Sequence, residues 1–104
     1  MMGKLRDSMS KPTKVTRSRF EYEESGHLAY LEFETDDRGW ITLLHTEVPS
    51  AIRGQGIAGM LVRTALDYAR DNKFRLDVVC PLAADFLRRH PELRPPGSTM
   101  PSGD

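Results

Sequence analysis

Three stretches in which apolar and polar residues alternate occupy the first half of the chain. They lie at about residues 14–23, 29–34 and 40–48, and short turns at Ser25-Gly26 and residues 36–39 separate them. A period of two places successive side chains on opposite faces of an extended strand. Strands joined by such short glycine-containing turns form an antiparallel meander. The first half therefore predicts three antiparallel strands.

The second half changes to helical periodicity. A loop at 50–55 leads into a predicted helix at 56–72, with a strand at 74–79 and a short helix at 81–90, bounded by Pro81 and Pro91. The apolar side of the long helix holds Ile57, Leu61, Ala65, Tyr68 and Ala69. A strand–helix–strand crossover is right-handed and makes the third and fourth strands parallel. The predicted fold class is α/β (α+β), a mixed, mostly antiparallel sheet in the order β-β-β-α-β-α with helices on its faces.

The ends of the chain lack periodicity and differ in composition from its middle. The length of 104 residues suits a single domain, which we place at 14–93. Residues 1–13 are predicted to be a disordered tail and 94–104 a flexible tail, because both are rich in Gly, Ser, Pro and charges. Basic residues crowd the start of the chain, which indicates either a solvated tail or a weak contact with an anionic partner.

Charge and cysteine content exclude several classes of function. The 15 basic and 15 acidic residues give a formal net charge of zero, which disfavours nucleic acid as the main partner. Cys80 is the only cysteine, so no intrachain disulfide can form, and no Cys/His cluster has zinc-site spacing. We therefore expect no metal. No apolar run has the length of a signal peptide core or a membrane span, so we expect a cytoplasmic protein and no membrane partner.

A glycine-rich loop stands between the third strand and the long helix. It reads Arg53-Gly54-Gln55-Gly56-Ile57-Ala58-Gly59. Its glycines allow sharp bends and close approach of a ligand to the backbone. The N–H groups at a helix start lack intrahelical partners and attract anions, and Arg53 adds a positive charge. The loop is thus either a pyrophosphate site or a plain tight turn, and it matches neither the Walker nor the dinucleotide pattern.

Here the sequence resembles a known superfamily. Arg53-x-x-Gly56-x-Ala58 looks like the Arg/Gln-x-x-Gly-x-Gly/Ala signature of the GNAT acetyltransferases. More narrowly, residues 14–93 resemble the small YidJ-like members, through 45–49, 53–59, 65–69, Cys80-Pro81 and His90-Pro91-Glu92. The resemblance implies a minimal GNAT fold, and acetyl-CoA (coenzyme A) as co-substrate.

The resemblance also implies which residues hold acetyl-CoA. Backbone groups of Thr46, Glu47 and Val48 would bind the pantetheine arm, admitted where the third and fourth strands part. The phosphates would be held by Arg53, Gly54, Gln55, Gly56, Ile57, Ala58 and Gly59.

Cys80 is the first candidate catalytic residue, because it lies where the fourth strand gives way to a helix begun by Pro81. A helix N-terminus favours a thiolate. By resemblance, Cys80 would either accept the acetyl group covalently or protonate the departing CoA thiolate. The alternative is a small, buried, apolar residue without a chemical role.

Glu47 and His45 are the candidate bases at the end of the third strand. Two residues apart on a strand, they should point the same way, and either could accept an amine proton directly or through water. The alternatives are a solvated charge for Glu47 and a structural histidine for His45.

The resemblance implies an acyl-CoA-dependent N-acetyltransferase whose acceptor is an amine on a small molecule or on a protein, such as a lysine. Two departures from the family keep alternatives open. The chain lacks the two helices that full-size members insert after the first strand, and it has no tyrosine beyond Tyr68 to protonate CoA. A module that binds CoA or acyl-CoA with little or no catalysis is the main alternative, and a plain interaction domain is another.

Overall fold

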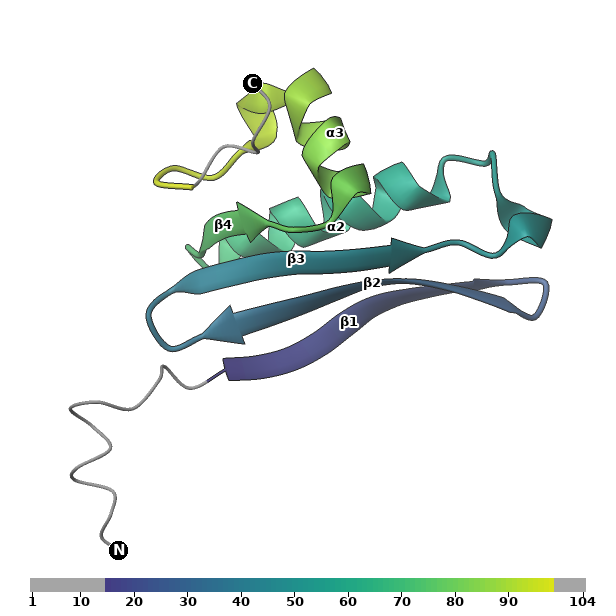
Figure 1. Cartoon of the computed structure of the whole chain (residues 1–104), viewed down its shortest axis with the longest axis horizontal. Helices are drawn as coiled ribbons and strands as arrows, with labels where there is room; N and C mark the ends of the chain where they lie inside the picture. The colour runs from purple at the N-terminus through teal and green to yellow at the C-terminus, as the bar shows by residue number, and fades with distance from the viewer. Residues whose placement is uncertain (1–14, 99–104) are drawn as a thin grey trace, which may run out of the picture.

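The computed structural model describes residues 15–98, in which four strands and two α-helices follow the predicted order (Figure 1). The predicted tail at 1–13 lies outside the described residues, as does the part of the second tail from 99 onward. The elements are β1 (Val15–Glu24), β2 (His27–Asp36), β3 (Trp40–Glu47), the 3-10 turn η1 (Ser50–Ile52), α2 (Ile57–Asp71), β4 (Arg75–Val78), α3 (Pro81–Arg89) and the 3-10 turn η2 (Pro91–Leu93).

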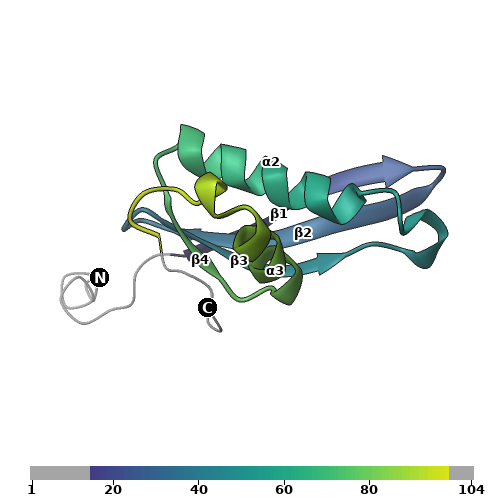
Figure 2. The ribbon, with the colours of Figure 1, turned by 90° about the horizontal axis from the view of Figure 1, so that it is seen from above.

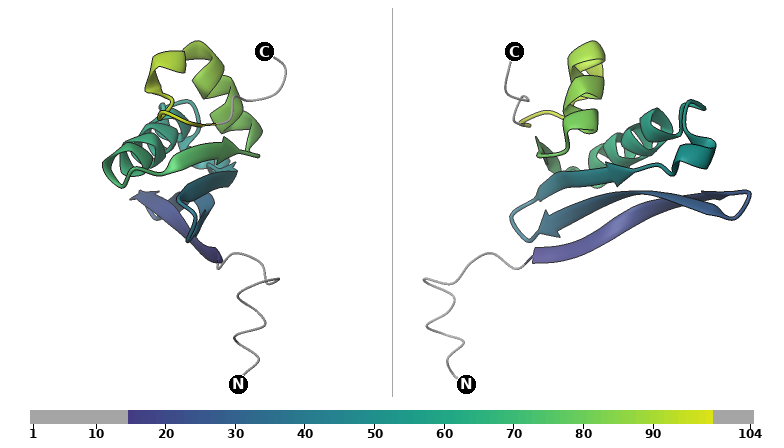
Figure 3. Two further views of the ribbon diagram at one scale, coloured as in Figure 1. Left: turned by 90° about the vertical axis from the view of Figure 1, so that its left-hand side faces the viewer. Right: turned by 45° about the vertical axis from the view of Figure 1, so that its right-hand side comes forward.

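The four strands form one mixed sheet in the order β1-β2-β3-β4. β1 pairs with β2 and β2 with β3 in antiparallel fashion, while β3 and β4 are parallel. The predicted fold class is confirmed, including the parallel pair that follows from the crossover through α2. β1 and β4 are the two edges of the sheet, and Figure 3 shows β1 at the edge far from α3.

The hydrophobic core lies between one face of the sheet and the helices. On β2, Ala29, Leu31 and Phe33 are buried, and the residues between them are only partly covered. α2 runs over the sheet and supplies buried side chains along one stripe, as the predicted periodicity requires (Figure 2). α3 packs against α2, β3 and β4, and adds Ala83 and Leu87 to the same cluster.

A bulge in β3 changes which side chains face the core. Phe33 of β2 is opposite Leu43, but Glu32 is opposite His45, so Leu44 is an extra residue in β3. An extra residue on one strand shifts the alternation of its side chains by one position. Before the bulge Leu43 is buried, and after it Thr46 is buried while His45 is exposed.

The described chain continues beyond the predicted domain end at residue 93. Residues 94–98 fold back on β4, where the Leu76 N–H donates to Ser98 Oγ (2.8 Å) and Arg94 Nη1 donates to the Ser98 carbonyl (3.1 Å). Pro95 is buried in this segment. The domain boundaries themselves stay a prediction.

Candidate functional site

β3 and β4 part halfway along β3. The last paired residues are Leu43 and Val78. The Leu43 carbonyl accepts the N–H groups of both Val79 (2.8 Å) and Cys80 (3.0 Å), and the chain then turns into α3. Within residues 15–98, no strand pairs with this side of β3 beyond that point. Unpaired backbone groups on a strand edge can hydrogen-bond an extended ligand, so this stretch of β3 is a potential binding edge.

The glycine-rich loop ends at the N-terminus of α2. Gly54 and Gly56 have φ angles of +82° and +77°, a left-handed conformation that favours glycine. Gly56 is the N-cap, and the first helical hydrogen bond runs from the Met60 N–H to the Gly56 carbonyl (3.0 Å). The N–H groups of residues 57–59 therefore have no intrahelical acceptor, and no acidic residue occupies the first turn. This helix start suits an anion.

The open edge of β3 and the start of α2 enclose a cavity of about 340 Å³. It is lined by Thr46, Glu47, Val48, Arg53, Gly54, Gly56, Ile57, Ala58 and Leu82. The structure thus brings the predicted pantetheine and phosphate segments together around one space. Gln55 and Gly59 do not line it. Leu82 was not predicted as a site residue. Its side chain is 46% exposed in the first turn of α3, and this exposure is visible only in the structure.

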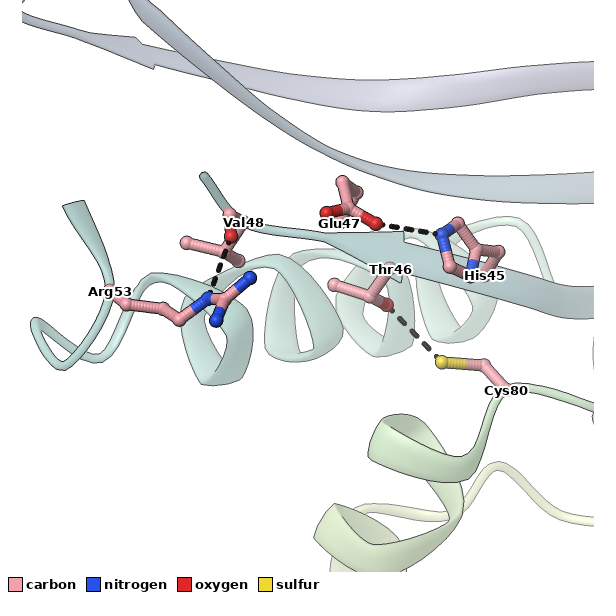
Figure 4. A network of polar contacts seen from close by, with 6 residues as sticks. All are labelled: His45, Thr46, Glu47, Val48, Arg53 and Cys80. Carbon is pink, nitrogen blue, oxygen red and sulfur yellow. Dashed lines mark hydrogen bonds and ion pairs between the residues drawn. The ribbon is translucent and has the colours of Figure 1, made fainter. Parts of the chain in front are cut away.

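Arg53 ties the loop to the end of β3. Its Nε donates to the Val48 carbonyl at 3.0 Å, as Figure 4 shows. That bond uses one guanidinium nitrogen and leaves the two terminal nitrogens for other acceptors. A positive charge is therefore held at the cavity wall beside the start of α2.

Cys80 is buried behind this wall. It is the N-cap of α3, which begins at Pro81 as predicted, and only 1% of its surface is exposed. Its Sγ lies 3.3 Å from Thr46 Oγ1, within hydrogen-bond distance. Thr46 lines the cavity and Cys80 does not. Thr46 thus connects the cavity wall to the thiol.

Glu47 and His45 lie on the other face of β3. His45 Nε2 is 3.2 Å from Glu47 Oε1, and both side chains are about half exposed, at 53% and 48%. The expectation that the two point the same way is confirmed. Figure 4 shows this pair on one side of the strand and the Thr46–Cys80 pair on the other. The structure therefore joins the candidate bases to each other but separates them from Cys80.

Gly59 is the last glycine of the loop and lies in the first turn of α2. A Cβ at Gly59 would lie 3.5 Å from Phe86 Cε2 on α3, an ordinary contact, so the space at this residue does not require glycine. At Gly54 and Gly56 a Cβ would meet nothing within 4 Å. Those two glycines are required by backbone conformation, and the space beside them is open.

Two further observations concern metal ions and membranes. Among residues 15–98, no group of three or more His, Cys, Asp or Glu residues is arranged to hold a metal ion. Neither described helix combines the length and apolarity needed to cross a membrane.

The sequence of this chain matches a known protein family. Residues 19–95 match the family described as GCN5-related N-acetyl-transferase (Acetyltransf_CG). The chain is 38% identical over 63 residues to Protein NATD1 of Bos taurus and 33% identical over 63 residues to Protein NATD1 of Homo sapiens. These alignments cover 61% of this chain and 56% of each relative, so the chain spans only a little over half of their length.

A solved structure shares the fold. A crystal structure of a protein from Agrobacterium tumefaciens that carries an acetyltransferase assignment superposes with a TM-score of 0.56 and 24% identity. The match covers 88% of this chain and 68% of the other. At this identity the likeness supports the fold alone.

Proposed function

The chain belongs to the GCN5-related N-acetyltransferase family, and we propose that it binds acetyl-CoA and transfers the acetyl group to an amine. The observation that carries the proposal is the cavity at which a strand edge without a partner meets a helix start with free N–H groups. Each of these two features suits a different part of the same elongated molecule.

The helix start would hold the pyrophosphate. The N–H groups of residues 57–59 lack intrahelical acceptors, and the left-handed Gly54 and Gly56 put no side chain between the backbone and a ligand. Arg53, fixed by its bond to Val48, would add charge-assisted hydrogen bonds.

The edge of β3 would hold the pantetheine arm. That arm carries amide groups, and an amide chain laid beside a strand edge can continue the ladder as another strand would. Thr46, Glu47 and Val48 line the cavity where β4 has already turned away. The arm would then run from the start of α2 along β3 toward Thr46.

The transfer itself needs little from the protein beyond positioning and proton movement. A neutral amine attacks the thioester carbonyl, a C–N bond forms, the C–S bond breaks, and CoA leaves as a thiolate. The proton lost by the amine would go to Glu47, which lines the cavity, or to His45, which contacts Glu47 and is about half exposed, directly or through water. A strand N–H of β3 would stabilise the oxyanion.

We assign Cys80 and Thr46 to the leaving-group side. The thiol is 1% exposed and touches Thr46 Oγ1, which itself lines the cavity. This burial favours a proton route to the CoA thiolate through the Thr46 hydroxyl over direct attack by Cys80 on the thioester. The separation of Cys80 from His45 by β3 supports separate acid and base roles on its two faces.

The finer assignment to the small YidJ-like members is also part of the proposal. β1 and β2 are joined only by Ser25-Gly26, so the helices that full-size members insert there are absent between these strands. An acceptor site without those helices is open, which suits an amine on a protein surface, such as a lysine, as well as a small amine.

A CoA-binding module with little catalysis is the second candidate. It is favoured by the burial of Cys80 and by the lack of a tyrosine after residue 68 in the sequence. Under this reading the cavity would hold CoA or acyl-CoA for another protein.

Calorimetry with acetyl-CoA and CoA, followed by mass spectrometry of amine and lysine-peptide mixtures, tests both readings. Binding with acetyl transfer supports the enzyme, and binding without transfer to any acceptor selects the module. An absence of binding rejects both. Thr46→Val compared with Cys80→Ala then tests the proton route, since both changes should slow transfer similarly if the two residues act in series. An acetyl adduct on Cys80 in the wild-type chain would overturn that route in favour of covalent catalysis.

A further inference from the structure

β1 is a long edge strand with a free outer side. All ten of its residues pair with β2, and within residues 15–98 no strand covers its other side (Figure 3). Such an edge presents a row of unpaired N–H and C=O groups that another strand can use. This edge is separate from the cavity and plays no part in the proposed function.

The hairpin turn fixes which backbone groups point outward. Ser25 and Gly26 both have positive φ angles, 53° and 80°, and they form a two-residue turn between Glu24 and His27. A turn of this kind makes its flanking residues a hydrogen-bonded pair, and such pairs alternate along an antiparallel ladder. Even-numbered residues of β1 therefore bond to β2, and odd-numbered residues direct their backbone groups outward.

The outward-bonding residues carry charges in an ordered row. Arg17, Arg19, Glu21 and Glu23 share the sheet face opposite the core, with two positive charges followed by two negative charges. The side chains of the first three are 59%, 41% and 48% exposed. When a second copy of the strand runs antiparallel beside the first, its negative charges lie opposite the positive charges of the first, and the reverse.

We propose that the outer edge of β1 pairs antiparallel with β1 of a second copy of this chain, with the two-fold axis at Phe20. This register sets Arg19 opposite Glu21 of the second copy and Arg17 opposite Glu23 of the second copy. Both pairs consist of odd-numbered residues, so they coincide with the hydrogen-bonded positions of the new ladder. Moving the axis to Arg19 or to Glu21 would put that residue opposite its own copy, a like-charge contact that is destabilising.

The inner face of the edge suits the same register. Phe20 stacks on Phe33 with ring centroids 4.6 Å apart and meets Tyr68 edge-on at 5.4 Å, while Tyr68 is 37% exposed. On the axis, Phe20 faces Phe20 of the second copy in a non-hydrogen-bonded pair, where side chains approach most closely. Apolar contact on one face and charge pairing on the other thus select the same arrangement.

Two of the arginines in the row already pair within one chain. Arg17 donates from Nε (3.2 Å) and Nη2 (2.8 Å) to Glu34 Oε2 on β2, so its pairing with Glu23 of the second copy would share the guanidinium with Glu34. Arg19 Nε donates to Glu21 Oε2 at 2.7 Å on the same strand. In the dimer two such pairs meet across the axis in opposite orientation, so that positive and negative charges alternate around the group. The competing explanation is that edge charges only protect β1 from association.

Sedimentation equilibrium of the full chain decides between these explanations. Arg19→Glu and Glu21→Arg each put like charges opposite each other at two symmetric places, so each should raise the dimer Kd about tenfold or more. The double variant R19E/E21R restores opposite charges and should return the Kd toward that of the wild type. Arg63→Glu, the same charge change on the exposed side of α2, should leave it unchanged.

The double variant also controls for a local contact. Arg19 lies over the Tyr30 ring, with Cζ 4.4 Å from its centroid, and the single and double variants at residue 19 both lose this contact. Recovery in the double variant would therefore report the pairing between copies.

Amide hydrogen exchange tests the register. The N–H groups of Arg17, Arg19, Glu21 and Glu23 should gain protection as protein concentration rises, while their even-numbered neighbours do not change. A monomer up to millimolar concentration overturns the proposal. So does a dimer that tolerates both single charge reversals, or a concentration-dependent protection confined to even-numbered residues.

Discussion

Replacing Gly56 with alanine should separate the stability of the loop from the acetyl-CoA binding proposed for it. Gly56 caps α2 with φ +77°, and an added Cβ would meet no atom within 4 Å. Gly39, in the turn between β2 and β3, has φ +91° and equally free space for a Cβ. It precedes β3, whereas the cavity begins at Thr46, about 23 Å along the strand at the usual rise per residue. Gly39→Ala is therefore a matched control.

The cost to stability can be estimated from these angles. A non-glycine residue in the left-handed region costs about 1–2 kcal/mol, and alanine recovers about 0.4–1 kcal/mol by restricting the unfolded chain. Since no clash adds to this, the difference between the two ranges leaves each variant a loss of up to about 1.6 kcal/mol of unfolding free energy. The two losses should be similar.

The cost to binding should differ between the two variants. Relaxation of the left-handed turn at Gly56, or its new methyl group, would move the N–H groups of residues 57–59 away from a phosphate. Losing one hydrogen bond to a charged group costs about 1.5–3 kcal/mol, a rise in Kd of about ten- to hundredfold. Gly39→Ala should leave the Kd within about twofold, because the effects of distant sites are independent.

Urea unfolding and calorimetric titration with acetyl-CoA measure the two quantities on the same samples. A role for the start of α2 in binding is refuted if Gly56→Ala binds acetyl-CoA as the wild type does, or if Gly39→Ala weakens binding equally. The first result would remove the helix start from the binding site. The second would trace the loss to general destabilisation.

Three other predictions follow from packing and from one pKa. Gly59→Ala should raise the unfolding free energy by about 0.5–1 kcal/mol, because Gly59 is inside a helix and the new methyl would make an ordinary contact at 3.5 Å. A lower unfolding free energy in urea would show that α3 cannot accommodate the methyl group. Leu66→Ala should lose about 2–5 kcal/mol, since this side chain is 1% exposed and leaves a cavity in the core; a loss below 1 kcal/mol would contradict the packing described. The pKa of Tyr22 is raised above its ordinary value by the hydrogen bond that its hydroxyl donates to Glu24 Oε1 (2.7 Å). This bond therefore stabilises the fold fully below about pH 10, and the stabilisation is lost as the pH rises through the raised pKa. Ultraviolet titration should show the ionisation of Tyr22 delayed, and Glu24→Ala, which removes the acceptor, should abolish that delay.

Much of the fold was predictable because its signals are local. Alternation in β2, the apolar stripe of α2 and the proline at the start of α3 each depend on neighbours a few residues apart. The start of α2 at Ile57 follows from Gly56, whose positive φ ends the loop. For the same reason an anion site in the glycine-rich loop could be predicted before any tertiary contact was known, and it stays a prediction.

The sequence by itself determined the order of the strands and helices and the position of the glycine-rich loop before α2. Only the tertiary structure decided which face of the sheet the side chains at the end of β3 occupy. Continued from Ile41 and Leu43, the alternation would turn His45 and Glu47 toward the core, but the extra residue Leu44 turns Thr46 inward instead. A bulge is a mismatch in residue count between two paired strands, so it has no signature within one strand. The parting of β3 from β4, and with it the cavity, likewise depends on contacts between segments far apart in the chain.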